Sequence, residues 1–98
     1  MPDKVPVSID KSDMKLRHRT FMVVDDFTLG RFQLMVRRKC LAEPLAPETA
    51  IYLMVHTQDP NKPLALCSAS TTIASLFDQY KNAQNVLVFD VKGENVFG

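Results

Sequence analysis

Residues 20–32 read Thr-Phe-Met-Val-Val-Asp-Asp-Phe-Thr-Leu-Gly-Arg-Phe and join a strand pattern directly to a helix pattern. The first five residues are rich in β-branched and aromatic side chains, which favours a strand over residues 20–24. Thr28 is placed as a helix N-cap, because its hydroxyl can accept a hydrogen bond from an amide of the first turn. Phe27 and Phe32 flank this cap at the spacing of a hydrophobic staple. The stretch therefore predicts a strand followed at once by a helix.

The predicted helix continues to about Cys40. Leu29, Phe32 and Val36 recur at helical spacing, which indicates one buried face. Residues 37–39 read Arg-Arg-Lys and occupy the last turn, where positive charge complements the helix dipole. This basic cluster therefore has a structural explanation that requires no ligand.

Three further elements are predicted downstream. Residues 50–55 are apolar on both faces, as expected of a central strand that a helix covers. Apolar residues at positions i, i+3, i+4 and i+7 predict a short amphipathic helix over 73–80, capped by Thr71 or Thr72. Residues 86–91 (Val-Leu-Val-Phe-Asp-Val) predict a last strand, and a polar end that we do not expect in the core follows them.

The start of the chain completes the order of elements. Residues 5–9 show the period-two alternation of a half-buried strand, and Pro6 indicates a sheet edge. With a right-handed crossover, the order strand, strand, helix, strand, short helix, strand predicts an α+β ubiquitin-like β-grasp fold. We expect a four-stranded mixed sheet with one main helix and a second short helix. The predicted domain covers 1–92, and 93–98 form a flexible C-terminal segment.

Composition limits the possible functions. The 98 residues carry 12 basic and 11 acidic side chains, so the charges nearly cancel and nucleic acid binding is not expected. Cys40 and Cys67 form no Cys-x-x-Cys pair, which fits a reducing compartment such as the cytosol. The longest apolar run, 50–55, is far shorter than the roughly 20 residues that cross a bilayer. Any membrane attachment must therefore be added chemically.

Three segments carry a resemblance to one known family. Residues 2–7 (Pro-Asp-Lys-Val-Pro-Val) are similar to the family pattern Pro-Asp-Arg-(Ile/Val)-Pro-Val. Residues 21–32 and 36–39 are similar to Tyr-Leu-Val-Pro-x-Asp-Leu-Thr-Val-Gly-Gln-Phe and Ile-Arg-Lys-Arg. Residues 93–98 (Gly-Glu-Asn-Val-Phe-Gly) are similar to Gly-Glu-Asn-Thr-Phe-Gly. On these segments the chain resembles the autophagy-related protein eight family of lipid-conjugated ubiquitin-like modifiers, without the two N-terminal helices typical of that family.

A terminal glycine has a chemical use in such modifiers. Its carboxylate has no Cβ to crowd it, so it can enter a narrow activating site and pass as a thioester between cysteines of other proteins. Gly98, preceded by Phe97, meets this need. The resemblance implies that Gly98 is joined to phosphatidylethanolamine on autophagosomal membranes by E1-like and E2-like enzymes. It also implies a processing and deconjugating cysteine protease, a monomeric chain that is cytoplasmic until conjugated, and no enzymatic activity of its own.

The resemblance further implies a groove for short linear motifs of cargo receptors and autophagy factors, each with an aromatic residue and an aliphatic residue three positions on. An extended peptide would pair with the edge of the strand at 20–24 and place two apolar anchors in pockets. The aliphatic pocket would be lined by Phe21, Val23, Val24, Phe27, Phe32 and Met35. The aromatic pocket would use Pro6, Ser8, Met22 and Val86. Core packing is the alternative for these side chains, since alternation along a strand turns half of them inward.

Charged residues near the groove complete the predicted site. Side chains that could hold acidic residues beside a motif are His18, Arg19, Arg37 and Lys39. A solvated surface is the alternative explanation for each of them. His18 and His56 stand apart in the sequence and form no cluster at metal-ligand spacing, so we expect neither a metal nor another cofactor.

Two other functions remain open on the sequence alone. One is a modifier of the autophagy-related protein twelve type, which has the same fold and is joined to a lysine of another protein. The other is a β-grasp binding module that is never conjugated. The chemical nature of any adduct on Gly98 separates these possibilities from the lipid-conjugated type.

Overall fold

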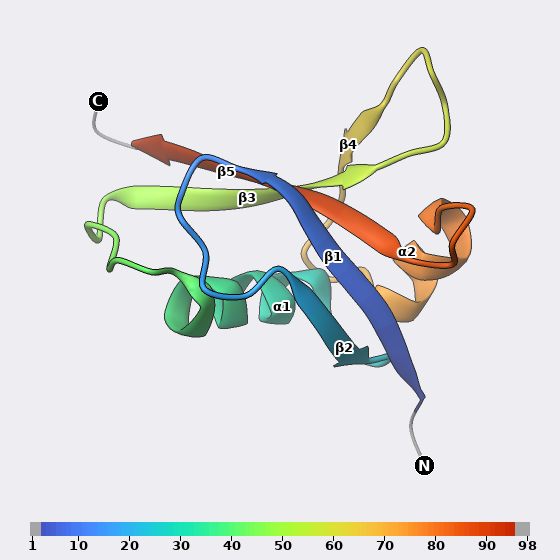
Figure 1. Cartoon of the computed structure of the whole chain (residues 1–98), viewed down its shortest axis with the longest axis horizontal. Helices are drawn as coiled ribbons and strands as arrows, with labels where there is room; N and C mark the ends of the chain where they lie inside the picture. The colour runs from blue at the N-terminus through green and yellow to red at the C-terminus, as the bar shows by residue number, and fades with distance from the viewer. Residues whose placement is uncertain (1–2, 96–98) are drawn as a thin grey trace.

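The computed structural model describes residues 3–95 of the chain. Its centre is one mixed sheet with the strand order β2-β1-β5-β3-β4, and α1 crosses one face of it (Figure 1). β1 runs antiparallel to β2 and parallel to β5, while β3 runs antiparallel to both β5 and β4. The strands are β1 (Lys4–Ser12), β2 (Thr20–Val24), β3 (Thr49–His56), β4 (Leu64–Leu66) and β5 (Leu87–Asn95). The helical segments are α1 (Leu29–Met35), the π-helical turn η1 (Val36–Cys40) and α2 (Ile73–Tyr80).

This architecture confirms the predicted α+β ubiquitin-like fold with one main and one short helix. The sheet has a fifth strand, β4, which was not predicted. β4 has three residues, and so short a segment cannot show the alternation on which strand prediction depends. It is held by its pairing with β3, where Leu64 lies opposite His56 and Leu66 opposite Met54.

β5 continues to Asn95, beyond the predicted end of this strand at Val91. The extension is held by backbone pairing with β3, in which Lys92 lies opposite Tyr52 and Asn95 opposite Thr49. Such pairing joins amide and carbonyl groups and does not depend on apolar side chains, so hydrophobic periodicity gave no sign of it. Residues 93–95 of the predicted C-terminal segment therefore belong to the sheet.

The two helix starts lie where the sequence predicts them. The Thr28 hydroxyl accepts a hydrogen bond from the Arg31 amide at 3.1 Å, which makes Thr28 the N-cap of α1. The Thr72 hydroxyl accepts from the Ser75 amide at 3.2 Å and caps α2 in the same way. The first helical segment ends at the predicted Cys40, although its last five residues form the wider η1 turn.

The first turns of α1 and α2 are also linked by backbone hydrogen bonds. In each helix an amide of the first turn donates to a carbonyl of the segment that precedes the other helix. The Ile73 amide donates to the Phe27 carbonyl at 2.8 Å, and the Gly30 amide donates to the Ala69 carbonyl at 2.9 Å. These bonds satisfy first-turn amides that have no partner within a helix. A Cβ at Gly30 would lie 3.1 Å from the Cβ of Ala69, so glycine is what permits this close approach.

Phe32 lies at the centre of the core. It is fully buried, and its ring centroid lies 5.5 Å from that of Phe21 and 5.7 Å from that of Phe89. The inward-facing apolar residues of β1, β3 and β5 pack around it together with those of the helices. Within residues 3–95, no helix is long and apolar enough to cross a membrane.

Candidate peptide-binding groove

β2 is the last strand at one margin of the sheet, and the strand order places only β1 beside it. Its side chains alternate: Val23 is buried and Phe21 is half-buried toward the core, whereas Met22 is 62% exposed on the opposite side. This alternation matches the expectation that Met22 and Phe21 face different ways. The strand therefore offers an open backbone edge with apolar side chains on both of its sides.

The first hollow lies on the Met22 side of β2 and has a volume of about 550 Å³. It is lined by all four side chains predicted for the aromatic pocket, which are Pro6, Ser8, Met22 and Val86. The structure adds lining residues from the turn before β5 and from β5 itself, namely Asn82, Gln84 and Val88. The place of Asn82 and Gln84 beside β2 was not predicted from the sequence.

Asn82 shapes this turn. Its side-chain oxygen accepts hydrogen bonds from the Gln84 amide at 2.9 Å and from the Val86 amide at 3.0 Å. Asn85 has a φ of 60°, a left-handed conformation that asparagine tolerates better than most residues. The turn therefore holds Val86 at the wall of the first hollow.

The second hollow lies between β2 and α1 and has a volume of about 170 Å³. Five of the six side chains predicted for the aliphatic pocket line it, and Met22 contributes as well. The lining is Phe21, Met22, Val23, Val24, Phe27 and Met35. Phe32 is the exception: it is fully buried behind Phe21, so it supports the pocket from within the core and does not line it.

The predicted basic contacts differ in their surroundings. The Arg37 guanidinium donates to the carbonyls of Thr49 and, at 3.2 Å, Ala46, and thereby fastens the loop between η1 and β3. Arg19 donates to the carbonyl of Asp10. His18 and Lys39 are exposed.

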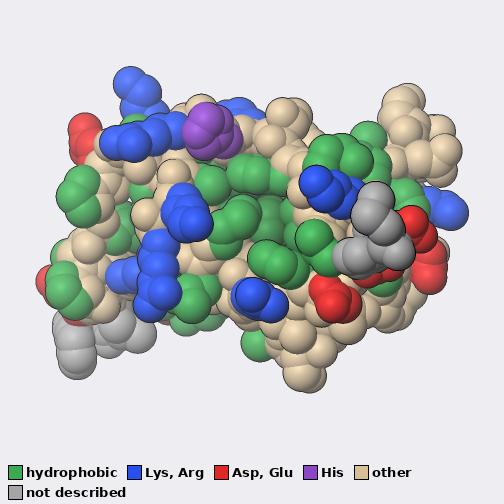
Figure 2. All heavy atoms as spheres, turned by 90° about the horizontal axis from the view of Figure 1, so that it is seen from below, with side chains coloured by type: hydrophobic (Ala, Val, Ile, Leu, Met, Phe, Trp, Pro, Cys, Tyr) green, Lys and Arg blue, Asp and Glu red, His purple; other side chains and the backbone are tan. Residues whose placement is uncertain are grey.

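Arg31 was not predicted as a contact. Its guanidinium lies 4.4 Å from the centre of the Phe27 ring, beside the second hollow. Figure 2 shows the molecule from the side of α1 and β2: hydrophobic side chains gather near the middle, with Lys and Arg side chains around them. The groove therefore combines apolar pockets with Lys and Arg side chains at their margins. Phe97 and Gly98, the predicted conjugation residues, lie outside the described residues.

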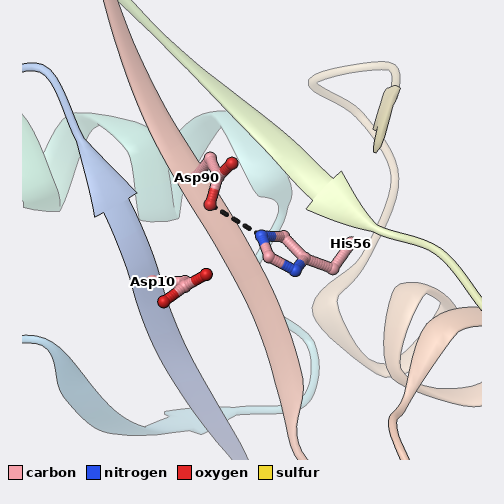
Figure 3. Close-up of side chains that lie close together, drawn as sticks. All are labelled: Asp10, His56 and Asp90. Atoms are coloured by element: carbon pink, nitrogen blue, oxygen red, sulfur yellow. Dashed lines mark hydrogen bonds and ion pairs between the residues drawn. The ribbon is translucent and has the colours of Figure 1, made fainter. Parts of the chain in front are cut away.

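The opposite face of the sheet holds a cluster that the sequence did not reveal. Figure 3 shows Asp10, His56 and Asp90 together, on the adjacent strands β1, β3 and β5. His56 Nε2 lies 2.6 Å from Asp90 Oδ1, and the Lys11 amide donates to the same oxygen at 3.1 Å. The expectation that His56 stands apart from other ionisable groups is therefore wrong. Residues far apart in sequence meet here because β5 lies between β1 and β3.

Asp90 is buried, with 3% of its surface exposed. Burial by itself raises the pKa of its carboxyl, but the hydrogen bonds from His56 and the Lys11 amide, with the charges of His56 and Lys92, outweigh this effect. The pKa of Asp90 is therefore lower than its ordinary value. The Asp90 carboxylate on β5 thus links β5 to its two neighbours, β1 through the Lys11 amide and β3 through His56.

We predict that Asp90→Asn lowers the free energy of unfolding at neutral pH by about 1–3 kcal/mol, because charge-assisted hydrogen bonds are lost. Folding lowers the pKa of Asp90, so the ionised carboxylate stabilises the fold. This stabilisation is complete at pH values above the pKa of an unfolded aspartate, about 3.9, and is lost as the pH falls through the lower pKa of the folded state. Urea unfolding at neutral and at strongly acidic pH should show the difference between variant and wild type shrinking in acid. Asp78→Asn, at an exposed position of α2, is the control; equal losses in both variants would contradict the assignment.

Comparisons with known proteins place the sequence and the fold in one family. A family model described as "Autophagy protein Atg8 ubiquitin like" matches residues 1–98. Autophagy-related protein 8d of Arabidopsis thaliana is 28% identical over 101 residues, which cover 99% of this chain and 76% of that protein. Autophagy-related protein 8 of Aspergillus niger is 27% identical over 100 residues, which cover 98% of this chain and 76% of that protein.

Two solved structures are similar as well. The crystal structure of Trypanosoma brucei ATG8 has a TM-score of 0.70 and 31% identity, and covers 98% of this chain and 78% of that chain. Plasmodium falciparum Atg8, solved in complex with a Plasmodium falciparum Atg3 peptide, has a TM-score of 0.68 and 18% identity, and covers 92% of this chain and 76% of that chain. The second likeness concerns the fold alone. From the match of the family model over the whole chain, and from the 31% identity to a solved relative, we conclude that this chain belongs to the Atg8 family of ubiquitin-like autophagy proteins.

Proposed function

We propose that the chain is a ubiquitin-like modifier that is joined through Gly98 to phosphatidylethanolamine and that binds short linear motifs in the groove along β2. It acts as a membrane-anchored adaptor on autophagosomes and is not an enzyme. The observation that carries the proposal is the pair of apolar hollows on the two sides of an open-edged strand, in a chain of the Atg8 family.

The two hollows differ in size, and this suggests which anchor each receives. The first is about 550 Å³ and the second about 170 Å³. An aromatic side chain suits the larger and an aliphatic side chain the smaller. This assignment agrees with a motif of the form aromatic-x-x-aliphatic.

The spacing of such a motif fits the position of the hollows. A peptide that adds to the edge of β2 alternates its side chains between the two faces of the sheet. Two anchors three positions apart therefore point to opposite sides and lie about 10 Å apart along the strand. The first hollow lies on the Met22 side of β2 and the second between β2 and α1, as this alternation requires.

Two observations support conjugation: the chain belongs to the Atg8 family, and β5 ends close to Gly98 in the sequence. That strand carries the chain to Asn95 in register with β3, only three residues before Gly98. The solved Plasmodium relative holds a peptide of Atg3, which makes a peptide of a conjugating enzyme a reasonable partner to test. Partners proposed on this basis are E1-like and E2-like enzymes, a deconjugating cysteine protease and motif-bearing receptors.

A peptide titration tests the groove. We expect a peptide with Trp-x-x-Leu and flanking acidic residues to shift the amide resonances of residues 21–27 in an NMR experiment. Met22→Glu should weaken binding at least about tenfold, because it places a charge in the apolar groove beside an acidic ligand. Leu66→Glu is a matched control, since Leu66 is 65% exposed on β4 at the other margin of the sheet.

The outcome is decisive in either direction. Equal weakening by Met22→Glu and Leu66→Glu would place binding elsewhere, and no shifts within residues 21–27 would remove the groove. Mass spectrometry of the adduct on Gly98 separately identifies the acceptor: a lipid mass supports the proposal, and an isopeptide bond to a protein lysine contradicts it.

A further inference from the structure

A third hollow lies beside η1, and its wall includes Arg37 and Lys39, two of the basic contacts predicted for the peptide groove. Its volume is about 470 Å³, and it shares no lining residue with either groove pocket. Four of its lining side chains are cationic: Arg17, Arg37, Arg38 and Lys39. The rest are apolar or small residues of α1 and of the segment 41–45.

Backbone hydrogen bonds hold this cationic hollow in shape. The Arg17 amide donates to the Cys40 carbonyl at 2.7 Å, and the Ala42 amide donates to the Lys15 carbonyl at 2.9 Å. These bonds join the loop between β1 and β2 to the segment that follows η1. The wall that carries Arg17 is therefore fixed opposite the wall that carries Arg38 and Lys39, and a ligand would meet a formed site.

All the charged side chains that line the hollow are positive. No Asp or Glu from residues 3–95 lines it. Across the same residues, the only ion pair joins His56 to Asp90 on the far face of the sheet. Arg37 donates to two backbone carbonyls, which leaves its charge in place. In a chain with a formal net charge of +1, four cations in one concavity make a local site for a concentrated anion.

A phosphate monoester is the anion that suits this site. Guanidinium groups bind phosphate through paired, charge-assisted hydrogen bonds, and a lysine adds a point charge. A monoester can carry two negative charges, whereas the diester of a common phospholipid carries one. A compact, multiply charged group can contact several of the cationic side chains that converge on this hollow at once.

The position of the hollow points to a membrane as the source of this group. Arg37, in its wall, donates to the Thr49 carbonyl, and Thr49 pairs with Asn95 at the end of β5. Figure 1 shows β5 ending at the same side of the molecule as the green segment that follows α1. Gly98 is three positions beyond Asn95, which is at most about 10 Å of extended chain. A lipid joined to Gly98 would thus hold this end of the molecule at the bilayer.

We propose that the hollow formed by Arg17, Arg37, Arg38 and Lys39 binds the phosphomonoester headgroup of an anionic lipid in the membrane to which the chain is attached. The inference rests on the proposed conjugation, because that linkage directs this end of the fold toward the bilayer. The headgroup contact adds a second, selective attachment to the covalent one, and it orients the groove along β2 relative to the membrane.

The test uses the unconjugated chain, so it does not depend on Gly98. Vesicles of phosphatidylcholine with phosphatidic acid present a phosphomonoester, and vesicles with phosphatidylserine present an anionic diester. We expect the chain to cosediment with the first more than with the second, and binding should weaken with added salt. Amide resonances of residues 15–17 and 37–45 should shift. Arg17→Gln/Arg38→Gln should lower binding about tenfold, while Lys4→Gln/Lys62→Gln, which removes the same charge elsewhere, should not.

Several results would overturn the inference. Equal binding to both anionic vesicles, or equal loss in the two double variants, would show that only general charge is involved. Shifts with soluble glycerol 3-phosphate without vesicle binding would assign the hollow to a free phosphate compound. Shifts of residues 15–17 and 41–45 with an acidic peptide that lacks phosphate and both apolar anchors would assign the hollow to a protein partner. If vesicle binding fails while Gly98 still forms its lipid adduct, this inference alone is wrong; if the adduct fails to form, the proposed function is wrong.

Discussion

Deletion of Gly98, or its replacement by alanine, is expected to abolish the thioester with the E1-like and E2-like enzymes and every later adduct. The reacting group is the terminal carboxylate, and a Cβ on its carbon crowds an activating site that admits an unbranched end. The expected loss is complete because the carboxylate then belongs to alanine or, after deletion, to Phe97, and each of these residues carries a Cβ. Non-reducing electrophoresis with purified enzymes and ATP measures the thioester, and mass spectrometry measures the adduct.

Two observations would separate this loss from misfolding. Gly98 lies outside residues 3–95, which hold the sheet and its core, so urea unfolding of the deletion variant should match wild type. Met22→Glu, which alters the groove, should still form the thioester. A chain without Gly98 that keeps its adduct would show that conjugation does not occur at this terminus.

Phe32→Ala is expected to lower the free energy of unfolding by about 3–5 kcal/mol. The side chain is fully buried and contacts the rings of both Phe21 and Phe89, so its removal leaves a cavity that β1, β5 and α1 cannot easily close. Small domains are stable by only about 5–15 kcal/mol, so this variant should be partly unfolded under mild conditions. Urea unfolding followed by far-UV circular dichroism gives the value.

Phe27→Ala is the matched control for this change. It removes the same atoms from a half-buried ring that lines the second hollow and lies under Arg31. We expect less than half the loss of stability but a clear loss of affinity for the motif peptide. Comparable losses of stability in the two variants would contradict the view that Phe32 belongs to the core and Phe27 to the site.

Local signals allowed much of the fold to be predicted. The bounds of β2 and the cap Thr28 depend on neighbours within a few residues and were predicted correctly, and Thr72 is one of the two residues predicted to cap α2. β4 and the end of β5 depend on which strand lies beside them: β4 is too short to show an alternation, and residues 92–95 carry no apolar side chain. Prediction failed where backbone pairing alone decides the structure.

In the candidate site too, local features were predicted and contacts between distant segments were not. The alternation along β2 correctly separated Met22 from Phe21, but it could not show that Phe32 lies behind Phe21. The contact of His56 with Asp90 joins two strands through a sequence separation of 34 residues, and only the strand order reveals it. The one local sign was an aspartate inside an otherwise apolar strand, which needs a partner when it is buried.

The bonds between the starts of α1 and α2 couple the groove to α2. Because the Phe27 carbonyl accepts from the Ile73 amide, the backbone beside the second hollow cannot move away without breaking this bond to the first residue of α2. Local unfolding in proteins proceeds through such cooperative units. A peptide seated on Phe27 should therefore slow hydrogen exchange in the first turn of α2, a segment it does not touch.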